Sequence, residues 1–130
     1  SLGPRFVSMN GAYDRALIKL AQQASDSIGE TLKQGTYAFV TGPTFESPAE
    51  VRFLQSTGCH MVGMSTVPEV IAARYQQLRV LAISAVTNCS VNSIHDEHIT
   101  NEEEVWESVG AIRPRLKAVI SGVLAGLGED

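Results

Sequence analysis

Apolar residues recur at intervals of three and four along two long stretches of the chain, which is the period of an amphipathic helix. The first stretch predicts a helix from Asn10 or Gly11 to about Ile28, and the last predicts one that begins near Thr100 and ends near Leu124. Two shorter helices are predicted between them, at residues 49–57 and at residues 67–77.

Three short stretches rich in apolar residues predict strands, at residues 36–40, 59–63 and 79–85. The third, RVLAISA, is almost continuously apolar, which is typical of a strand covered on both faces. Helices and strands alternate, so we expect an α/β fold with a mixed, largely parallel sheet flanked by helices. A chain of 130 residues predicts a single domain over residues 1–130.

Polar groups gather in the loops that follow the predicted strands. Gly42-Pro43 ends the first strand, and Ser47 with Glu50 forms a capping box that starts the next helix. Glu46 therefore lies in a short loop, either as a functional carboxylate or as a second cap or solvated charge. Thr66 with Glu69, and Thr100 with Glu103, repeat the capping pattern.

Thr87 and Asn88 follow the third predicted strand, at its carboxyl end. Ligands of open α/β sheets bind at that edge. The loops Gly42–Ser47 and Gly63–Thr66 and this strand end can therefore converge on one pocket.

Composition excludes several classes of protein. Hydrophobic residues make up 44% of the chain and charged residues 18%, which indicates a globular protein. The net charge is −4 and no basic stripe is present, so nucleic acid is not expected as a partner. No apolar run is long enough for a membrane span. No signal peptide is apparent, so a cytoplasmic location is expected. Cys59 and Cys89 are expected to be free thiols.

A metal site is not expected. His95, Asp96, Glu97 and His98 follow one another in a polar loop, but neighbouring side chains in a flexible loop seldom converge on one ion. A solvated loop is the favoured interpretation. His60 is interpreted as a partly buried packing residue, because no second metal-binding residue type lies nearby in the sequence.

Three segments resemble the family of trimeric purine nucleoside phosphorylases and its methylthioadenosine phosphorylase relatives: GTYAFVTGPTFESPAE, VGMSTVPEVIAAR and SAVTN. The segment GPRFVSMNGAYDRAL is similar as well. The resemblance implies cleavage of the bond between ribose and a purine by inorganic phosphate, which is a co-substrate, with no cofactor. It also implies a homo-oligomer, a trimer in the full-length family. The chain matches the C-terminal half of the family.

The resemblance assigns a role to each matching position. Glu46 would bind the purine N1 and exocyclic edge, and Asn88 would donate to N7 and O6, so these two are the expected catalytic residues. Ser65 would hydrogen-bond phosphate, and Met64 would contact the ribose. The remaining expected substrate-binding residues are Phe45 against the base, Tyr37 near the ribose, and Val62, Gly63, Thr87 and Glu102 in the pocket.

The sequence departs from the family in two respects. A histidine near the sugar 5′-hydroxyl is replaced by Glu102, with His98 as the displaced equivalent if the alignment is gapped. The glycine-rich phosphate loop and an Arg/His pair of the family's first half are not found, so the chain alone is expected to have little or no activity. The alternatives are a methylthioadenosine phosphorylase, which Asn88 disfavours because that relative prefers aspartate there, and a non-catalytic purine-binding fragment.

Overall fold

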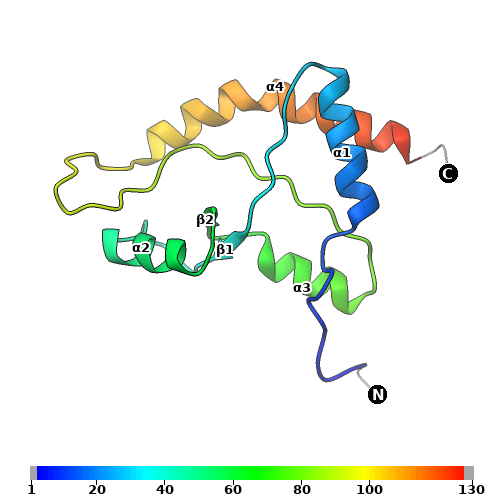
Figure 1. Cartoon of the computed structure of the whole chain (residues 1–130), viewed down its shortest axis with the longest axis horizontal. Helices are drawn as coiled ribbons and strands as arrows, with labels where there is room; N and C mark the ends of the chain where they lie inside the picture. The colour runs from blue at the N-terminus through cyan, green and yellow to red at the C-terminus, as the bar shows by residue number, and fades with distance from the viewer. Residues whose placement is uncertain (1–2, 128–130) are drawn as a thin grey trace. The chain divides into compact units, whose positions relative to one another are not determined.

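The structure is a computed structural model that describes residues 3–127, and Figure 1 shows the course of the chain. The prediction of an α/β fold is confirmed, with helices and a small parallel sheet. Among the described residues, no helix is both long and apolar enough to cross a membrane. The elements, in chain order, are α1 (Arg15–Ser27), β1 (Tyr37–Phe39), α2 (Pro48–Ser56), β2 (Met61–Gly63), α3 (Val67–Tyr75) and α4 (Glu102–Gly126).

The chain forms two compact units. The first unit contains residues 3–32, 65–83 and 115–127, and therefore holds α1, α3 and the second half of α4. The second unit contains residues 33–64 and 84–114, with β1, β2, α2 and the first half of α4. The single domain expected over residues 1–130 stays a prediction.

The core of the first unit lies between α1 and the end of α4. Ala21, Ala24 and Val123 are buried together, and Leu20, Leu32 and Leu81 pack against them. This contact is close: a Cβ atom added to Gly122 would lie 2.7 Å from the Cβ of Ala24. The helical period predicts an apolar face of α1 that includes Ala21, Ala24 and Ile28, and the structure buries the first two but leaves Ile28 44% exposed. Glycine in α4 permits the close approach.

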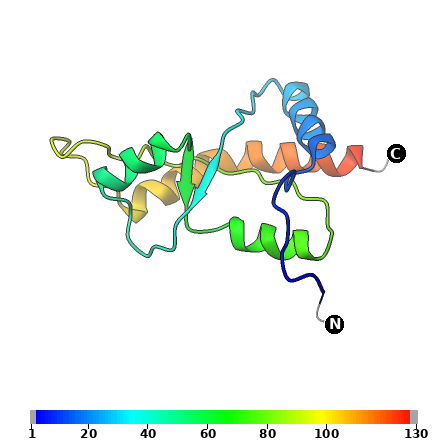
Figure 2. The same cartoon turned by 60° about the horizontal axis from the view of Figure 1, so that its bottom comes forward.

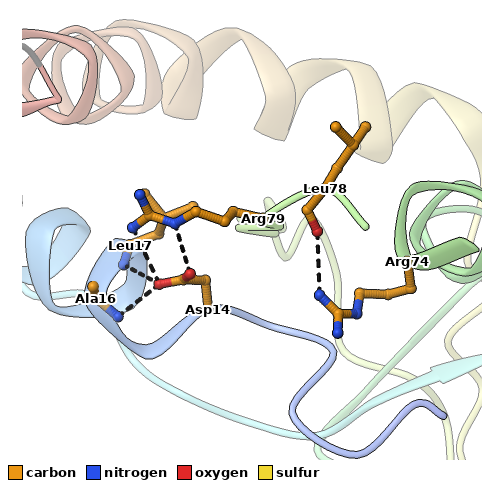
Figure 3. A network of polar contacts seen from close by, with 6 residues as sticks. All are labelled: Asp14, Ala16, Leu17, Arg74, Leu78 and Arg79. Atoms are coloured by element: carbon orange, nitrogen blue, oxygen red, sulfur yellow. Dashed lines mark hydrogen bonds and ion pairs between the residues drawn. The ribbon is translucent and has the colours of Figure 1, made fainter. Parts of the chain in front are cut away.

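Helix α1 begins at Arg15, so the prediction of a start at Asn10 or Gly11 is wrong. Asp14 is the N-cap, and its side chain accepts hydrogen bonds from the backbone N–H groups of Ala16 at 2.8 Å and Leu17 at 3.1 Å. The same carboxylate accepts from Arg79 Nε at 2.7 Å, as Figure 3 shows. A charged carboxylate is a stronger acceptor for these N–H groups than the side chain of Asn10 would be.

The second unit contains the parallel pair β1 and β2, seen side by side in Figure 2. Tyr37 pairs with Met61, and Phe39 pairs with Gly63. Each strand has three residues, fewer than predicted. His60 is exposed, so its interpretation as partly buried is wrong. Its Nδ1 accepts the backbone N–H of Thr36 at 3.0 Å, and the carbonyl of Thr36 accepts the backbone N–H of His60 at 2.9 Å, so this pair of residues continues the contact before β1.

Two further predictions of local structure are wrong. Thr66 has φ = 75°, and its side chain makes no capping bond, because an N-cap side chain reaches the helix only from an extended backbone. At the start of α4, the cap is Asn101 and not Thr100. Asn101 Oδ1 accepts the backbone N–H of Glu104 at 3.0 Å.

The prediction of a strand at residues 79–85 is also wrong, since the structure assigns none there. A strand needs a neighbouring strand that pairs with its backbone. The carbonyl of Val80 instead accepts the backbone N–H of Asp14, at 2.8 Å.

Two glycines of α4 allow the helix contact to be tested. Gly122→Ala should lower the free energy of unfolding, because the methyl group of Ala24 cannot rotate away from the added Cβ atom. Overpacking of this kind costs about 1–3 kcal/mol. Gly110 is the matched control, since a Cβ there meets nothing within 4 Å. Gly110→Ala should raise the free energy of unfolding by about 0.5–1 kcal/mol. Urea denaturation measures both, and equal stabilisation by the two variants would contradict this packing.

The ion pair of Asp14 predicts a pH dependence. Hydrogen bonds from the Arg79 side chain and the Leu17 backbone lower the pKa of Asp14 from 3.8 to about 2. Because the folded-state pKa is depressed, this stabilisation is complete above pH 3.8 and is lost as the pH falls towards 2.

Asp14→Asn keeps a capping oxygen but removes the charge, so the variant should lose less stability than the parent between pH 5 and pH 2. The exposed Asp26, also in α1, provides the control variant Asp26→Asn. Urea denaturation across the pH range measures the effect. Identical curves for Asp14→Asn and the parent would show that the ion pair adds nothing.

Candidate functional site

The loop between β1 and α2 has the structure that the sequence predicts. The hydroxyl of Ser47 accepts the backbone N–H of Glu50 at 3.4 Å, and Glu50 Oε2 accepts the backbone N–H of Ser47 at 2.8 Å. The hydroxyl and the backbone N–H of Ser47 both lower the pKa of Glu50. This capping box is confirmed.

Glu46 lies one residue before this cap and is half-buried. Ser47 and Glu50 occupy the capping positions, so Glu46 is not needed as a second cap. None of the hydrogen bonds or ion pairs among the described residues uses its carboxylate. The carboxylate is therefore available as an acceptor for a ligand.

The ends of the two strands bring further predicted site residues together. The Tyr37 side chain lies against Gly63 so closely that a Cβ atom there would be 2.1 Å from the Tyr37 hydroxyl oxygen. In the same way, the sulfur of Met64 lies against Gly42, which has φ = 61° and begins the loop of Glu46. Gly63 and Gly42 are thus positions where a larger residue would displace a predicted site residue.

Phe45 and Met64, two of the predicted substrate-binding residues, expose large apolar side chains. Phe45 is 47% exposed and Met64 is 39% exposed. Val62 is half-buried between its strand neighbours in β2. Exposed apolar side chains beside a free carboxylate suit the binding of a flat, polar-edged ligand such as a base.

Asn88 is held by its neighbour. The hydroxyl of Thr87 donates to Asn88 Oδ1 at 2.9 Å, and the carbonyl of Thr87 accepts the hydroxyl of Ser108 at 2.7 Å. Both Thr87 and Asn88 are half-buried. The Thr87 hydroxyl uses one of the two acceptor sites of the amide oxygen and fixes which way the amide faces, and the NH₂ group is then the donor that can bind a ligand.

A cavity of about 490 Å³ lies beside Asn88, within the second unit. Three carboxylates contribute to its wall, and no lysine or arginine does. The predicted residues Thr87, Asn88 and His98 line it, and the sequence interpretation missed most of the others. The lining residues are Thr87, Asn88, Cys89, Ser90, Val91, Asp96, His98, Glu104, Glu107 and Ser108.

The two candidates for the sugar 5′-hydroxyl contact occupy different surroundings. His98 lines the cavity, where its Nε2 lies 3.3 Å from Glu104 Oε2. Glu102 is the first residue of α4, and its Oε1 accepts the indole N–H of Trp106 at 3.0 Å. Glu102 is not among the residues that line this cavity. The geometry therefore favours His98 as the residue that shares a site with Asn88.

Three sequence predictions remain, which concern Ser65, the presence of a metal site and the two cysteines. Ser65 is exposed and belongs to the first unit, where its hydroxyl lies 3.3 Å from that of Thr66. Among the described residues, no three His, Cys, Asp or Glu side chains are gathered closely enough to hold a metal ion. Cys59 and Cys89 are free thiols, as predicted.

One missed residue had a signal in the sequence. Ser108 lies between Val105 and Val109 on the apolar stripe of α4, where a polar residue is unexpected. A polar residue on an apolar stripe points to a specific hydrogen bond, which here is the bond to Thr87.

Comparison with known proteins identifies the family. Residues 1–125 match the family model described as the phosphorylase superfamily. The chain is similar to purine nucleoside phosphorylase 1 of Bacillus subtilis, with 45% identity over 111 residues. That match covers 84% of this chain and 41% of the relative.

Solved structures agree with this result. The chain is similar to Schistosoma purine nucleoside phosphorylase solved with hypoxanthine, with a TM-score of 0.91 and 38% identity. That match covers 95% of this chain and 45% of the other. The Schistosoma mansoni enzyme solved with adenosine gives the same TM-score, identity and coverage.

The chain thus spans less than half the length of these relatives. The prediction of a resemblance to part of a purine nucleoside phosphorylase is confirmed. This chain belongs to the phosphorylase superfamily, and within it is similar to the purine nucleoside phosphorylases.

Proposed function

We propose that this chain is the base- and sugar-binding part of a purine nucleoside phosphorylase. The enzyme would cleave the N-glycosidic bond of 6-oxopurine ribonucleosides and deoxyribonucleosides, such as inosine and guanosine. A phosphate oxygen would bond to C1′ of the sugar while the electron pair of the broken bond passes to the purine, which takes up the proton that hydrogen phosphate loses. The products are the free base and ribose 1-phosphate or deoxyribose 1-phosphate.

The observation that carries this proposal is the orientation of the Asn88 amide at the wall of the cavity. The Thr87 hydroxyl occupies Oδ1, so Nδ2 is the donor that can reach N7 and O6 of a purine. Negative charge develops on the base as the glycosidic bond breaks. A donor aimed at N7 therefore stabilises the transition state more than the ground state.

The other base contacts follow the same logic. Glu46 has a free carboxylate that accepts the N1–H of a 6-oxopurine, and Phe45 exposes a ring that packs on the base. Met64 offers soft apolar contact under the sugar, with Tyr37, Val62 and Gly63 as its neighbours in or beside the strands. His98, or Glu102 in its place, would contact the 5′-hydroxyl.

Phosphate would bind outside this cavity. The carboxylates of Asp96, Glu104 and Glu107 line it without a lysine or arginine, so the potential inside repels an anion. Ser65 remains the proposed phosphate contact, in the other unit. A hydroxyl alone is a weak anion site, because strong phosphate binding uses charged donors such as arginine.

The remaining parts of the proposal concern the whole protein. We infer that it needs no cofactor and uses inorganic phosphate as a co-substrate. We also infer that it acts in the cytoplasm and assembles as a homo-oligomer, with a trimer as the expected form. Neither nucleic acid nor a membrane is a proposed partner.

Methylthioadenosine phosphorylase is not favoured as an alternative, since a 6-amino group needs an acceptor where Asn88 presents a donor. A non-catalytic purine-binding fragment would bind base without turnover.

Base preference tests the assignment of Asn88 and Glu46. The chain should bind hypoxanthine and guanine more tightly than adenine, since an unpaired buried polar group costs roughly 1–3 kcal/mol. Asn88→Asp should shift the preference towards adenine. Isothermal titration calorimetry measures the dissociation constants.

Asn92→Asp is the matched control, because it adds the same charge in the same loop but does not line the cavity. The Schistosoma mansoni enzyme has been solved with adenosine. A crystal structure with a bound nucleoside therefore does not establish which base a site prefers, and dissociation constants must be compared. Equal affinity for hypoxanthine and adenine would contradict the roles of both residues.

A phosphate-dependent assay with inosine tests how much of the site the chain holds. Turnover by the chain alone should be negligible. Correct orientation of two reactants can lower the activation barrier by roughly 7–11 kcal/mol, and a badly placed phosphate loses most of that reduction. The assay measures hypoxanthine release with and without phosphate. Turnover within about tenfold of a full-length relative, a loss of only about 1.4 kcal/mol, would overturn the proposed location of phosphate binding.

A further inference from the structure

We propose that Ser108 is a positioning residue for Asn88: through the Thr87 carbonyl, it fixes the backbone from which the Asn88 amide is presented to the base. This inference rests on the proposed function for its consequence in base choice. Its structural part, that Ser108 sets the orientation of the Asn88 amide, can be tested without any substrate.

Two hydrogen bonds connect Ser108 to Asn88 through Thr87. The hydroxyl of Ser108 donates to the carbonyl of Thr87 at 2.7 Å, across 21 residues of sequence. The hydroxyl of Thr87 in turn donates to Asn88 Oδ1 at 2.9 Å. Thr87 is therefore held from α4 through its backbone and holds Asn88 through its side chain. All three residues line the same cavity.

The segment needs such an anchor because it is not part of a sheet. The structure assigns no strand to residues 78–88, so no ladder of backbone bonds fixes Thr87. At the other end of this short stretch, Arg52 of α2 donates from Nη1 to the carbonyl of Asn92 at 2.7 Å. Side chains from two helices thus hold the stretch that contains Asn88.

The geometry of Ser108 does not suit a purely local role. Serine within a helix commonly bonds to a carbonyl of its own preceding turn. Here the hydroxyl bonds to a carbonyl of another segment. Alanine is the better helix former, so α4 itself gains nothing from serine at this position. The benefit of the hydroxyl lies in the loop that it holds.

The consequence of losing this bond is local. Thr87 and Ser108 both line the cavity, so water can replace the Ser108 hydroxyl and global stability should change little. The backbone at Thr87 would nevertheless lose its fixed position, and the Asn88 amide would sample orientations in which Nδ2 no longer faces N7. Binding of hypoxanthine should weaken about tenfold, in line with the loss of one well-aligned hydrogen bond, and binding of adenine should change less.

The experiment uses the full chain and two readouts. Nitrogen-15 NMR reports the side-chain NH₂ signals of the four asparagines, and the Asn88 pair is identified by its loss in Asn88→Asp. Calorimetry gives the dissociation constants for hypoxanthine and adenine. We expect Ser108→Ala to shift or broaden the Asn88 NH₂ signals and to reduce the preference for hypoxanthine. Ser108→Thr keeps the hydroxyl and should restore both.

Two further variants serve as controls. Thr87→Val removes the hydroxyl that contacts Asn88 directly, so it should change the same NH₂ signals and define the size of a full effect. Ser121→Ala makes the same substitution as Ser108→Ala at an exposed position of α4, and should leave the Asn88 signals unchanged.

The outcomes separate the two proposals. Unchanged Asn88 NH₂ signals in a folded Ser108→Ala variant would overturn the positioning role, as would equal shifts in all four asparagines. If the parent chain binds hypoxanthine no better than adenine, the proposed function fails, and the NMR result alone then decides the role of Ser108.

Discussion

The extended segment from residue 79 to residue 88 has no strand ladder in the described part of the chain, and this constraint shapes what surrounds it. Its backbone is held by other elements at two points. Near its start, the Asp14 N–H donates to the Val80 carbonyl, and the Arg79 guanidinium binds the Asp14 carboxylate. At its end, the Ser108 hydroxyl donates to the Thr87 carbonyl. One backbone bond and two side-chain contacts therefore take the place of the ladder that a neighbouring strand supplies in a sheet.

The groups that hold this segment also contribute to other parts of the structure. The Asp14 carboxylate is also the cap of α1, so the same group fixes a helix start and the chain at Arg79 (Figure 3). Helix α4 contributes Val123 to the core of the first unit and Ser108 to the cavity wall of the second. Substitutions at such residues are therefore expected to affect more than one element.

Features encoded within a few residues could be predicted from the sequence. The capping box of Ser47 and Glu50 depends on residues three apart, and the structure contains it. The predicted strand at residues 79–85 needed a partner that is not local, and the prediction was wrong. The cap at Thr66 was wrong for a different reason: its backbone lies at φ = 75°, which the sequence pattern does not indicate.

The same distinction applies to the candidate site. Asn88 and Thr87 are adjacent in sequence, so their polar strand-end pattern could be recognised, and Glu46 could be placed by the caps around it. The bond from Ser108 to Thr87 spans 21 residues, and the bond from Arg52 to Asn92 spans 40. Pairings at such separations depend on how the elements pack, which the hydrophobic period alone does not specify.

The charge of the cavity gives a physical reason why the orientation of the Asn88 amide would matter for the proposed reaction. Carboxylates of Asp96, Glu104 and Glu107 surround the space beside Asn88. A purine that gains negative charge as its glycosidic bond breaks is disfavoured by these groups, since like charges repel. A correctly aimed N–H donor offsets this repulsion at the atom where the charge develops, and a misaligned donor leaves it uncompensated. If the proposed function is correct, catalysis by Asn88 in this acidic cavity would depend on the groups that hold its amide, which we propose are Thr87 and Ser108.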